Sequence, residues 1–126
     1  MMRQPVTTRL GLLVGVAGAS AVLLGAFGAH GLRDVLHAEK LELWHIAVDY
    51  HVWHALALAL AAGLGRGRSG RFAIAALASG IVLFSGSLYA LALGAPRWMG
   101  IVTPFGGLAF IAGWIALGLS LSRGND

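Results

Sequence analysis

Residues that could carry out chemistry gather in one part of this chain, residues 25–54. All five histidines and four of the five acidic residues lie there. Imidazole exchanges protons near neutral pH and, like carboxylate, binds metal ions. On a helix, His45 would neighbour Asp49, and His51 would neighbour His54. A metal site and a proton-handling site are therefore two hypotheses for this segment.

Structural roles compete with both hypotheses. The chain has no cysteine and no His-Glu-x-x-His motif, so thiolate ligands and the pattern of a hydrolytic zinc site are excluded. The glycines at positions 25, 28 and 31 lack the preceding strand of a dinucleotide-binding unit. No Ser–His pair with an oxyanion loop and no acidic dyad is recognisable. We therefore expect no metal, no cofactor and no enzymatic activity.

The elements that must position these residues are helices in a membrane. Hydrophobic residues make up 58% of the chain, charged residues only 11%, and the mean hydropathy is +0.80. A soluble domain has about a quarter of its residues charged, and roughly 20 apolar residues suffice to cross the ~30 Å hydrocarbon core. The sequence predicts an all-α integral membrane four-helix bundle, one domain over residues 1–126, embedded in a lipid bilayer. Its spans are residues 10–29, 46–64, 72–93 and 101–121.

Between the first two spans the chain has a short segment with helical spacing. Leu32, Val35 and Leu36 recur at i, i+3 and i+4, and charged or polar residues separate them. This pattern is typical of an amphipathic helix with one apolar face. It predicts a short helix lying in the headgroup region between spans one and two.

Small residues indicate where the helices pack. In the first span Gly11 and Gly15 form a G-x-x-x-G pair, and membrane helices associate where small residues let their backbones approach. This span is longer than a signal-peptide core of ~7 to 15 residues, so we expect it to be retained. We also expect it to be central to the bundle or to a dimer. The glycines expected at packing sites are Gly11, Gly15, Gly25, Gly28, Gly86, Gly106, Gly107 and Gly113.

Positive charge is concentrated on one side of the predicted spans. Six basic residues lie on the side of the two termini, namely Arg3, Arg9, Arg66, Arg68, Arg71 and Arg123, and three lie on the other, namely Arg33, Lys40 and Arg97. By the positive-inside rule both termini face the cytoplasm. The net charge of +4 therefore indicates topology and not nucleic-acid binding. The histidine-rich segment then lies at the outer end, and the polar residues of the second span lie close to the headgroups.

Four motifs follow one another along the chain. They are G-A-F-G-A-H-G-L at residues 25–32, Tyr50-x-x-x-His54 before A-L-A-L, F-S-G-S-L-Y at residues 84–89, and T-P-x-G-G at residues 103–107 with a later G-W. This order resembles DUF423, a family of small four-helix membrane proteins. The family usually has glutamine where this chain has His51. The resemblance implies a bacterial inner-membrane protein and no established activity.

A polar cluster at the outer end is the candidate site. Serine hydroxyls can hydrogen-bond across membrane helices, and Tyr50 and His54 share one face of the second span. We expect an accessory or scaffold protein whose partner is a second copy or another membrane protein. The alternative is a binder or transporter of a small molecule, an ion or protons. The cluster comprises His30, Asp49, Tyr50, His54, Ser85, Ser87, Tyr89 and Thr103, and most of these are motif positions of the resemblance.

Overall fold

Helices account for almost all of the residues that the computed structural model describes, 6–122. α1 (Thr8–His30) and α2 (Ala38–Leu64) come first, and a continuous helical rod, Gly67–Ala92, follows. The rod consists of α3 (Gly67–Gly80), a π-helical turn η1 (Ile81–Ser85) and α4 (Gly86–Ala92). After the rod, the 3-10 helix η2 (Arg97–Ile101) leads into α5 (Val102–Ser122). Within the described residues, four helices are long and apolar enough to cross a membrane. The predicted all-α four-helix membrane bundle is confirmed.

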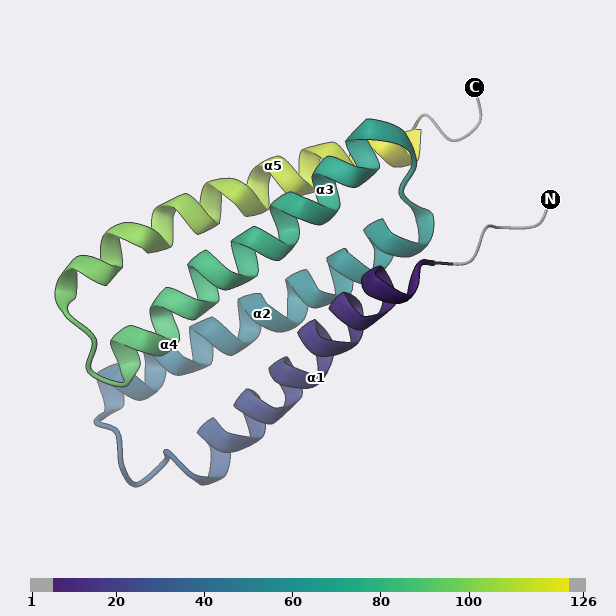
Figure 1. Ribbon diagram of the computed structural model, residues 1–126. Coiled ribbons are helices and arrows are strands. Elements are labelled where there is room, and N and C mark those ends of the chain that lie inside the picture. The colour runs from purple at the N-terminus through teal and green to yellow at the C-terminus, as the bar shows by residue number, and fades with distance from the viewer. Residues whose placement is uncertain (1–5, 123–126) are drawn as a thin grey trace.

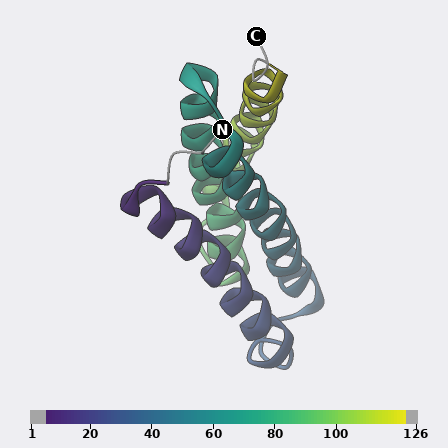
Figure 2. The same ribbon diagram turned by 90° about the vertical axis from the view of Figure 1, so that its right-hand side faces the viewer.

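The long helices lie side by side in chain order (Figure 1). α1 begins and α5 ends on the same side of the molecule. α3 and α5 make the most extensive contact, whereas α1, among the described residues, packs extensively on α2 alone. Figure 2 shows α1 running along the outer side of the bundle. The prediction that the first helix is central to the bundle is therefore wrong, and its place in a dimer stays a prediction.

Glycines allow α5 to approach the rod closely. A Cβ atom added at Gly106 would overlap the backbone of Phe84, and one added at Gly113 would lie 2.8 Å from Cδ2 of Leu77. Gly80, which the sequence did not single out, faces α5 in the same way. Side chains larger than hydrogen at these positions would push the two helices apart. The predicted packing roles of Gly106 and Gly113 are confirmed.

Glycines also let α1 pack closely against α2. The indole ring of Trp44 covers Gly28 so closely that no Cβ fits between them, and a Cβ at Gly25 would lie 3.2 Å from Cγ1 of Val48. The Nε1–H group of Trp44 donates to the backbone oxygen of Leu24 over 2.9 Å. This hydrogen bond satisfies the one polar atom of a side chain that is 2% exposed. The second half of α1 is therefore the part held most firmly.

The other glycines chosen from the sequence do not pack against a neighbouring helix. A Cβ at Gly11, Gly15 or Gly86 would have no atom of another residue within 4 Å. At Gly107 it would make only an ordinary contact, 3.9 Å from the ring of Phe84. The packing prediction for Gly11, Gly15 and Gly86 is wrong within this chain: α1 turns its G-x-x-x-G face away from the bundle, and Gly86 in α4 faces open space.

Residues 31–37 form turns in place of the predicted interfacial helix. The amide of Leu36 donates to the carbonyl of Leu32 over 3.0 Å, which closes a single turn. Leu32 is buried and packs with Trp44. Leu32 and Leu36 therefore pack against the bundle, whereas Val35 is exposed. The next helix, α2, begins at Ala38, well before the predicted start of the second span at residue 46.

The π-helical turn η1 ends at a buried serine. A π-helix holds more residues per turn than an α-helix, and such turns occur frequently near functional sites. Ser85 is fully buried, and its hydroxyl donates to the backbone oxygen of Ala47 in α2 over 2.7 Å. This hydrogen bond ties the middle of the rod to α2.

Replacing Ser85 by alanine should therefore weaken the bundle. We expect Ser85→Ala to lower the free energy of unfolding by roughly 0.6 to 1.7 kcal/mol, the range for side-chain hydrogen bonds between membrane helices. The measurement is unfolding of the detergent-solubilised protein. Ser79→Ala is the matched control, because Ser79 lies on the same rod and is exposed. An equal loss in both variants would show that the bond to Ala47 contributes nothing.

Candidate functional site

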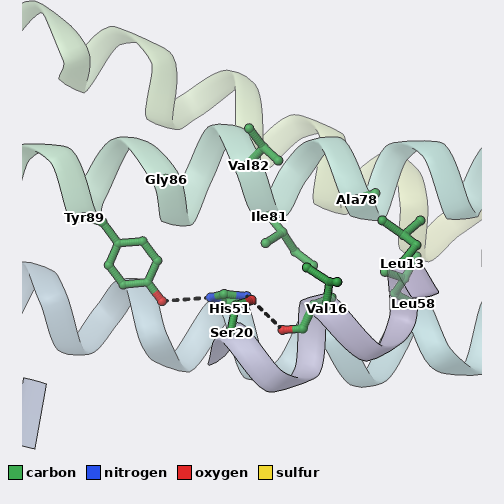
Figure 3. A pocket seen from close by; sticks show the side chains of 11 residues that line it. Leu13, Val16, Ser20, His51, Leu58, Ala78, Ile81, Val82, Gly86 and Tyr89 are labelled. Carbon is green, nitrogen blue, oxygen red and sulfur yellow. Dashed lines mark hydrogen bonds between the residues drawn. The ribbon is translucent and has the colours of Figure 1, made fainter. Parts of the chain in front are cut away.

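A cleft separates α1 from the rod, with α2 as its floor (Figure 3). Its volume is about 350 Å³, within the range of small-molecule sites, about 300 to 1,000 Å³. Val16 on one wall and Val82 on the other are 64% and 70% exposed. The cleft therefore opens sideways, toward the lipid when the protein lies in a membrane. Most of the remaining lining is apolar and includes Leu13, Leu58, Ala78 and Ile81.

A chain of three polar side chains lies in this apolar cleft. The hydroxyl of Tyr89 in α4 is 2.9 Å from Nδ1 of His51 in α2. The other ring nitrogen of His51, Nε2, is 3.1 Å from Oγ of Ser20 in α1. Figure 3 shows the three side chains in line across the cleft. They link the three helical segments that surround it.

The hydrogen bonds that link the three polar side chains all point from Tyr89 toward Ser20. The single hydroxyl hydrogen of Ser20 is donated to the backbone oxygen of Ala17 over 3.1 Å. Oγ of Ser20 therefore accepts a hydrogen bond from Nε2–H of His51. Nδ1 of the neutral imidazole then accepts the hydroxyl hydrogen of Tyr89. The oxygen of Tyr89 retains its own capacity to accept, so the polar end of the cleft is an acceptor.

The polar chain lies deep in the bundle. His51 is the middle residue of Ala38–Leu64 and is 4% exposed, and Ser20 lies near the middle of Thr8–His30. The sequence placed the polar residues of α2 near its outer end, whereas His51 lies midway along the helix because α2 begins eight residues before residue 46. Ionisable side chains at such depth are costly in a membrane and are a functional hypothesis by default.

Glycine at position 86 leaves room beside the polar chain. Gly86 lines the cleft one helical turn before Tyr89. A Cβ at this position would meet no atom within 4 Å. Any larger side chain would therefore extend into the cleft and not into a neighbouring helix. Gly86 shapes the cavity and has no part in packing.

Two of the predicted cluster serines bond between helices and do not line the cleft. Ser85 donates to Ala47 as described above, and Oγ of Ser87 lies 2.5 Å from the hydroxyl oxygen of Thr103 in α5. Ser87 also donates to the backbone oxygen of Phe84 over 3.0 Å. These bonds hold the rod to α2 and to α5.

Tyr50 and His54 take part in an aromatic stack. The ring of His54 lies on that of Phe110 with centroids 3.5 Å apart, and its Nδ1–H group donates to the backbone oxygen of Tyr50 over 2.6 Å. The ring of Tyr50 packs against that of Phe84 at a centroid distance of 4.5 Å. His54 is buried. The stacked ring and this hydrogen bond therefore hold His54 inside the bundle.

The remaining predicted residues lie on the surface. His30 ends α1 and Asp49 lies on α2, and both are exposed. Asp49 shares this exposure with His45, its neighbour one turn away. The part of the chain that the structure describes contains no group of three or more His, Cys, Asp or Glu side chains placed to hold a metal ion. The eight predicted residues therefore form several separate contacts and not one cluster.

The geometry describes a membrane bundle, and comparison with known proteins identifies its family. A family model described as "Protein of unknown function (DUF423)" matches residues 24–107. The chain belongs to the DUF423 family. The resemblance drawn from the four motifs is confirmed, and the chain is an integral membrane protein. No solved structure matches it.

Bacterial relatives of this DUF423 chain have names that describe them as membrane proteins. The UPF0382 membrane protein YwdK of Bacillus subtilis is 46% identical over 77% of this chain and 82% of its own length. A UPF0382 membrane protein of Haemophilus influenzae is 44% identical over 83% and 86% of the two chains. The UPF0382 inner membrane protein YgdD of Escherichia coli is 42% identical over 82% and 81%. These names specify a location and no reaction.

Two polar residues of the cleft, Ser20 and His51, were not in the predicted cluster. The DUF423 match includes His51 but begins at residue 24, so Ser20 lies outside it. One signal in the sequence could have found Ser20, because it is the only residue with a polar side chain in residues 10–29. A lone hydroxyl in an apolar span is suited to bond to a neighbouring helix. Burial of His51 depends on where α2 begins, which the apolar pattern did not give.

Proposed function

We propose that this DUF423 protein binds a lipid-soluble molecule in the cleft beside α1 and carries out no reaction on it. The observation that supports this function is the polar chain Ser20–His51–Tyr89 inside a cleft that is otherwise apolar and opens toward lipid. Purely structural polar groups, such as Ser85, are closed between helices. The polar side chains Ser20, His51 and Tyr89 instead border an open cavity.

The polar chain suggests the chemistry of the ligand. The apolar body of the ligand contacts Val16 and Val82 and enters from the bilayer without crossing water. Its head lies in the space left by Gly86, where the oxygen of Tyr89 accepts a hydrogen bond. A molecule with a long apolar body and one hydroxyl or amide donor fits these features. An alkyl chain with no polar group fits the walls but gains nothing from the polar chain.

Removing His51 should release this ligand. We expect protein extracted mildly from its own membrane to carry a stoichiometric adduct in native mass spectrometry, and His51→Ala to lose it. His51→Gln should keep most of the adduct, because a glutamine amide also offers one donor and one acceptor. His45→Ala is the matched control, since His45 is an exposed histidine on the same helix.

Two results would contradict the proposal. One is wild-type protein with no adduct other than ordinary phospholipid. The other is an adduct of equal mass and occupancy in wild type and His51→Ala. A melting temperature of His51→Ala close to wild type, measured in parallel, separates loss of the ligand from loss of the fold.

An accessory or scaffold role is the second candidate. Among residues 6–122, α1 packs extensively on α2 alone, and its Gly11 and Gly15 face is exposed. Such a face suits a second copy of this chain or another membrane protein, since small residues allow close helix approach. A discrete dimer or a copurifying protein in the same mass spectra would favour this role. The cleft makes the binding function the better supported of the two.

We further propose that the protein lies in the bacterial inner membrane with both termini in the cytoplasm. The described residues support this through Arg9, Arg66, Arg68 and Arg71, which lie at the end where α1 begins and α5 ends. Arg3 and Arg123, which also entered the prediction, lie outside the described residues. The name of the Escherichia coli relative also supports an inner-membrane location.

A further inference from the structure

One end of the bundle carries only positive charge among the described residues. Arg9 lies at the start of α1, and Arg66, Arg68 and Arg71 lie where α2 gives way to α3. Every carboxylate that the structure describes lies within residues 34–49, toward the other end of the bundle. Arg9, Arg68 and Arg71 therefore lie at an end of the bundle where the structure describes no carboxylate. This surface attracts anions.

A groove between α3 and α5 begins at this basic end. Its volume is about 480 Å³. Arg68 and Ser69, in the first turn of α3, form its polar end, and Phe72, Ile115 and Leu119 line the apolar part. These three apolar side chains are about half exposed or more. The groove shares no lining residue with the cleft.

We propose that this groove binds an anionic phospholipid. One acyl chain lies along Phe72, Ile115 and Leu119, and the phosphate lies at the guanidinium of Arg68 and the hydroxyl of Ser69. The apolar part alone would accept the acyl chain of any lipid. The basic end provides selectivity, because a zwitterionic headgroup carries its own cation next to the phosphate and the arginines repel that cation. This site is independent of the function proposed for the cleft.

The test compares two lipids that differ only in their headgroups. Delipidated full-length protein in detergent is titrated with phosphatidylglycerol or phosphatidylcholine of identical acyl chains, and native mass spectrometry reports the bound fraction. We expect phosphatidylglycerol to bind about fivefold more tightly, the effect of roughly one arginine near an anionic headgroup. Arg68→Gln should abolish this preference. Arg97→Gln, which removes an exposed arginine at the opposite end, should leave it unchanged.

A second variant tests the groove without changing charge. Ala112 lines the groove and is half-buried, so Ala112→Leu fills part of it. We expect this variant to weaken the binding of both lipids. A preference that persists in Arg68→Gln, or that disappears equally in Arg97→Gln, would overturn the proposal. Lipid binding that is unchanged in Ala112→Leu would overturn it as well.

Discussion

Replacing Gly86 by leucine should reduce occupancy of the cleft by about tenfold or more without unfolding the protein. The Cβ of the new side chain meets no atom within 4 Å, so the substitution does not force α4 away from another helix. It fills the space beside Tyr89 in which the head of the ligand is proposed to lie. Glycine in a helix interior is also about 0.5 to 1 kcal/mol less favourable than alanine. Stability should therefore stay the same or rise while binding falls.

Opposite changes in binding and stability make this variant informative. The retained adduct is measured by native mass spectrometry, and the melting temperature is measured on the same preparation. Gly11→Leu is the matched control, since Gly11 also has open space around it but does not line the cleft. The control should keep the adduct. If Gly86→Leu kept it too, the ligand would have to bind elsewhere.

Gly106→Ala should give the largest loss of stability of the variants considered. A Cβ here would overlap the backbone of Phe84, so the methyl group cannot be accommodated by turning a side chain. α5 would have to move away from the rod along their shared interface. Overpacking of this kind costs about 1 to 3 kcal/mol. The measurement is the free energy of unfolding in detergent.

Gly118→Ala is the control for this variant, because Gly118 lies on the same helix with no atom within 4 Å of an added Cβ. It should be neutral or stabilising, as expected for alanine in place of glycine in a helix. Equal stability of the two variants would mean that α5 does not rest on the backbone at Phe84. The pair therefore tests the packing of α5 directly.

The sequence predicted the membrane architecture well because apolar length is a strong physical signal. Four stretches long enough to cross the hydrocarbon core correspond to the four long helices. It was less informative about where α2 begins. The charged residues from Ala38 to His45 suggested the headgroup region, yet a helix continues beyond the hydrocarbon at little cost, because its backbone bonds are internal. The sequence therefore did not show that His51 lies midway along α2.

Partners of individual side chains could not be derived in the same way. Glycine spacing marked Gly11 and Gly15 as strongly as Gly106, although only Gly106 faces another helix. The spacing says that close approach is allowed at a position, but not which face of the helix turns inward. The polar residues raised the same difficulty, since Ser85 and Tyr89 are near in sequence but bond to different residues of α2.

The π-helical turn bears on how sequences of such chains correspond to one another. If the five residues of this turn were wound as α-helix instead, α4 would turn by about 100° relative to α3, the rotation of one helical residue. The letters that follow the turn would be unchanged, yet Tyr89 would no longer point at His51, and Ser87 would lose Thr103. The targets of these side chains thus depend on how the turn before them is wound. A chain with the same residues in α4, one residue fewer in the preceding turn and an ordinary α-helix there would keep the same cleft.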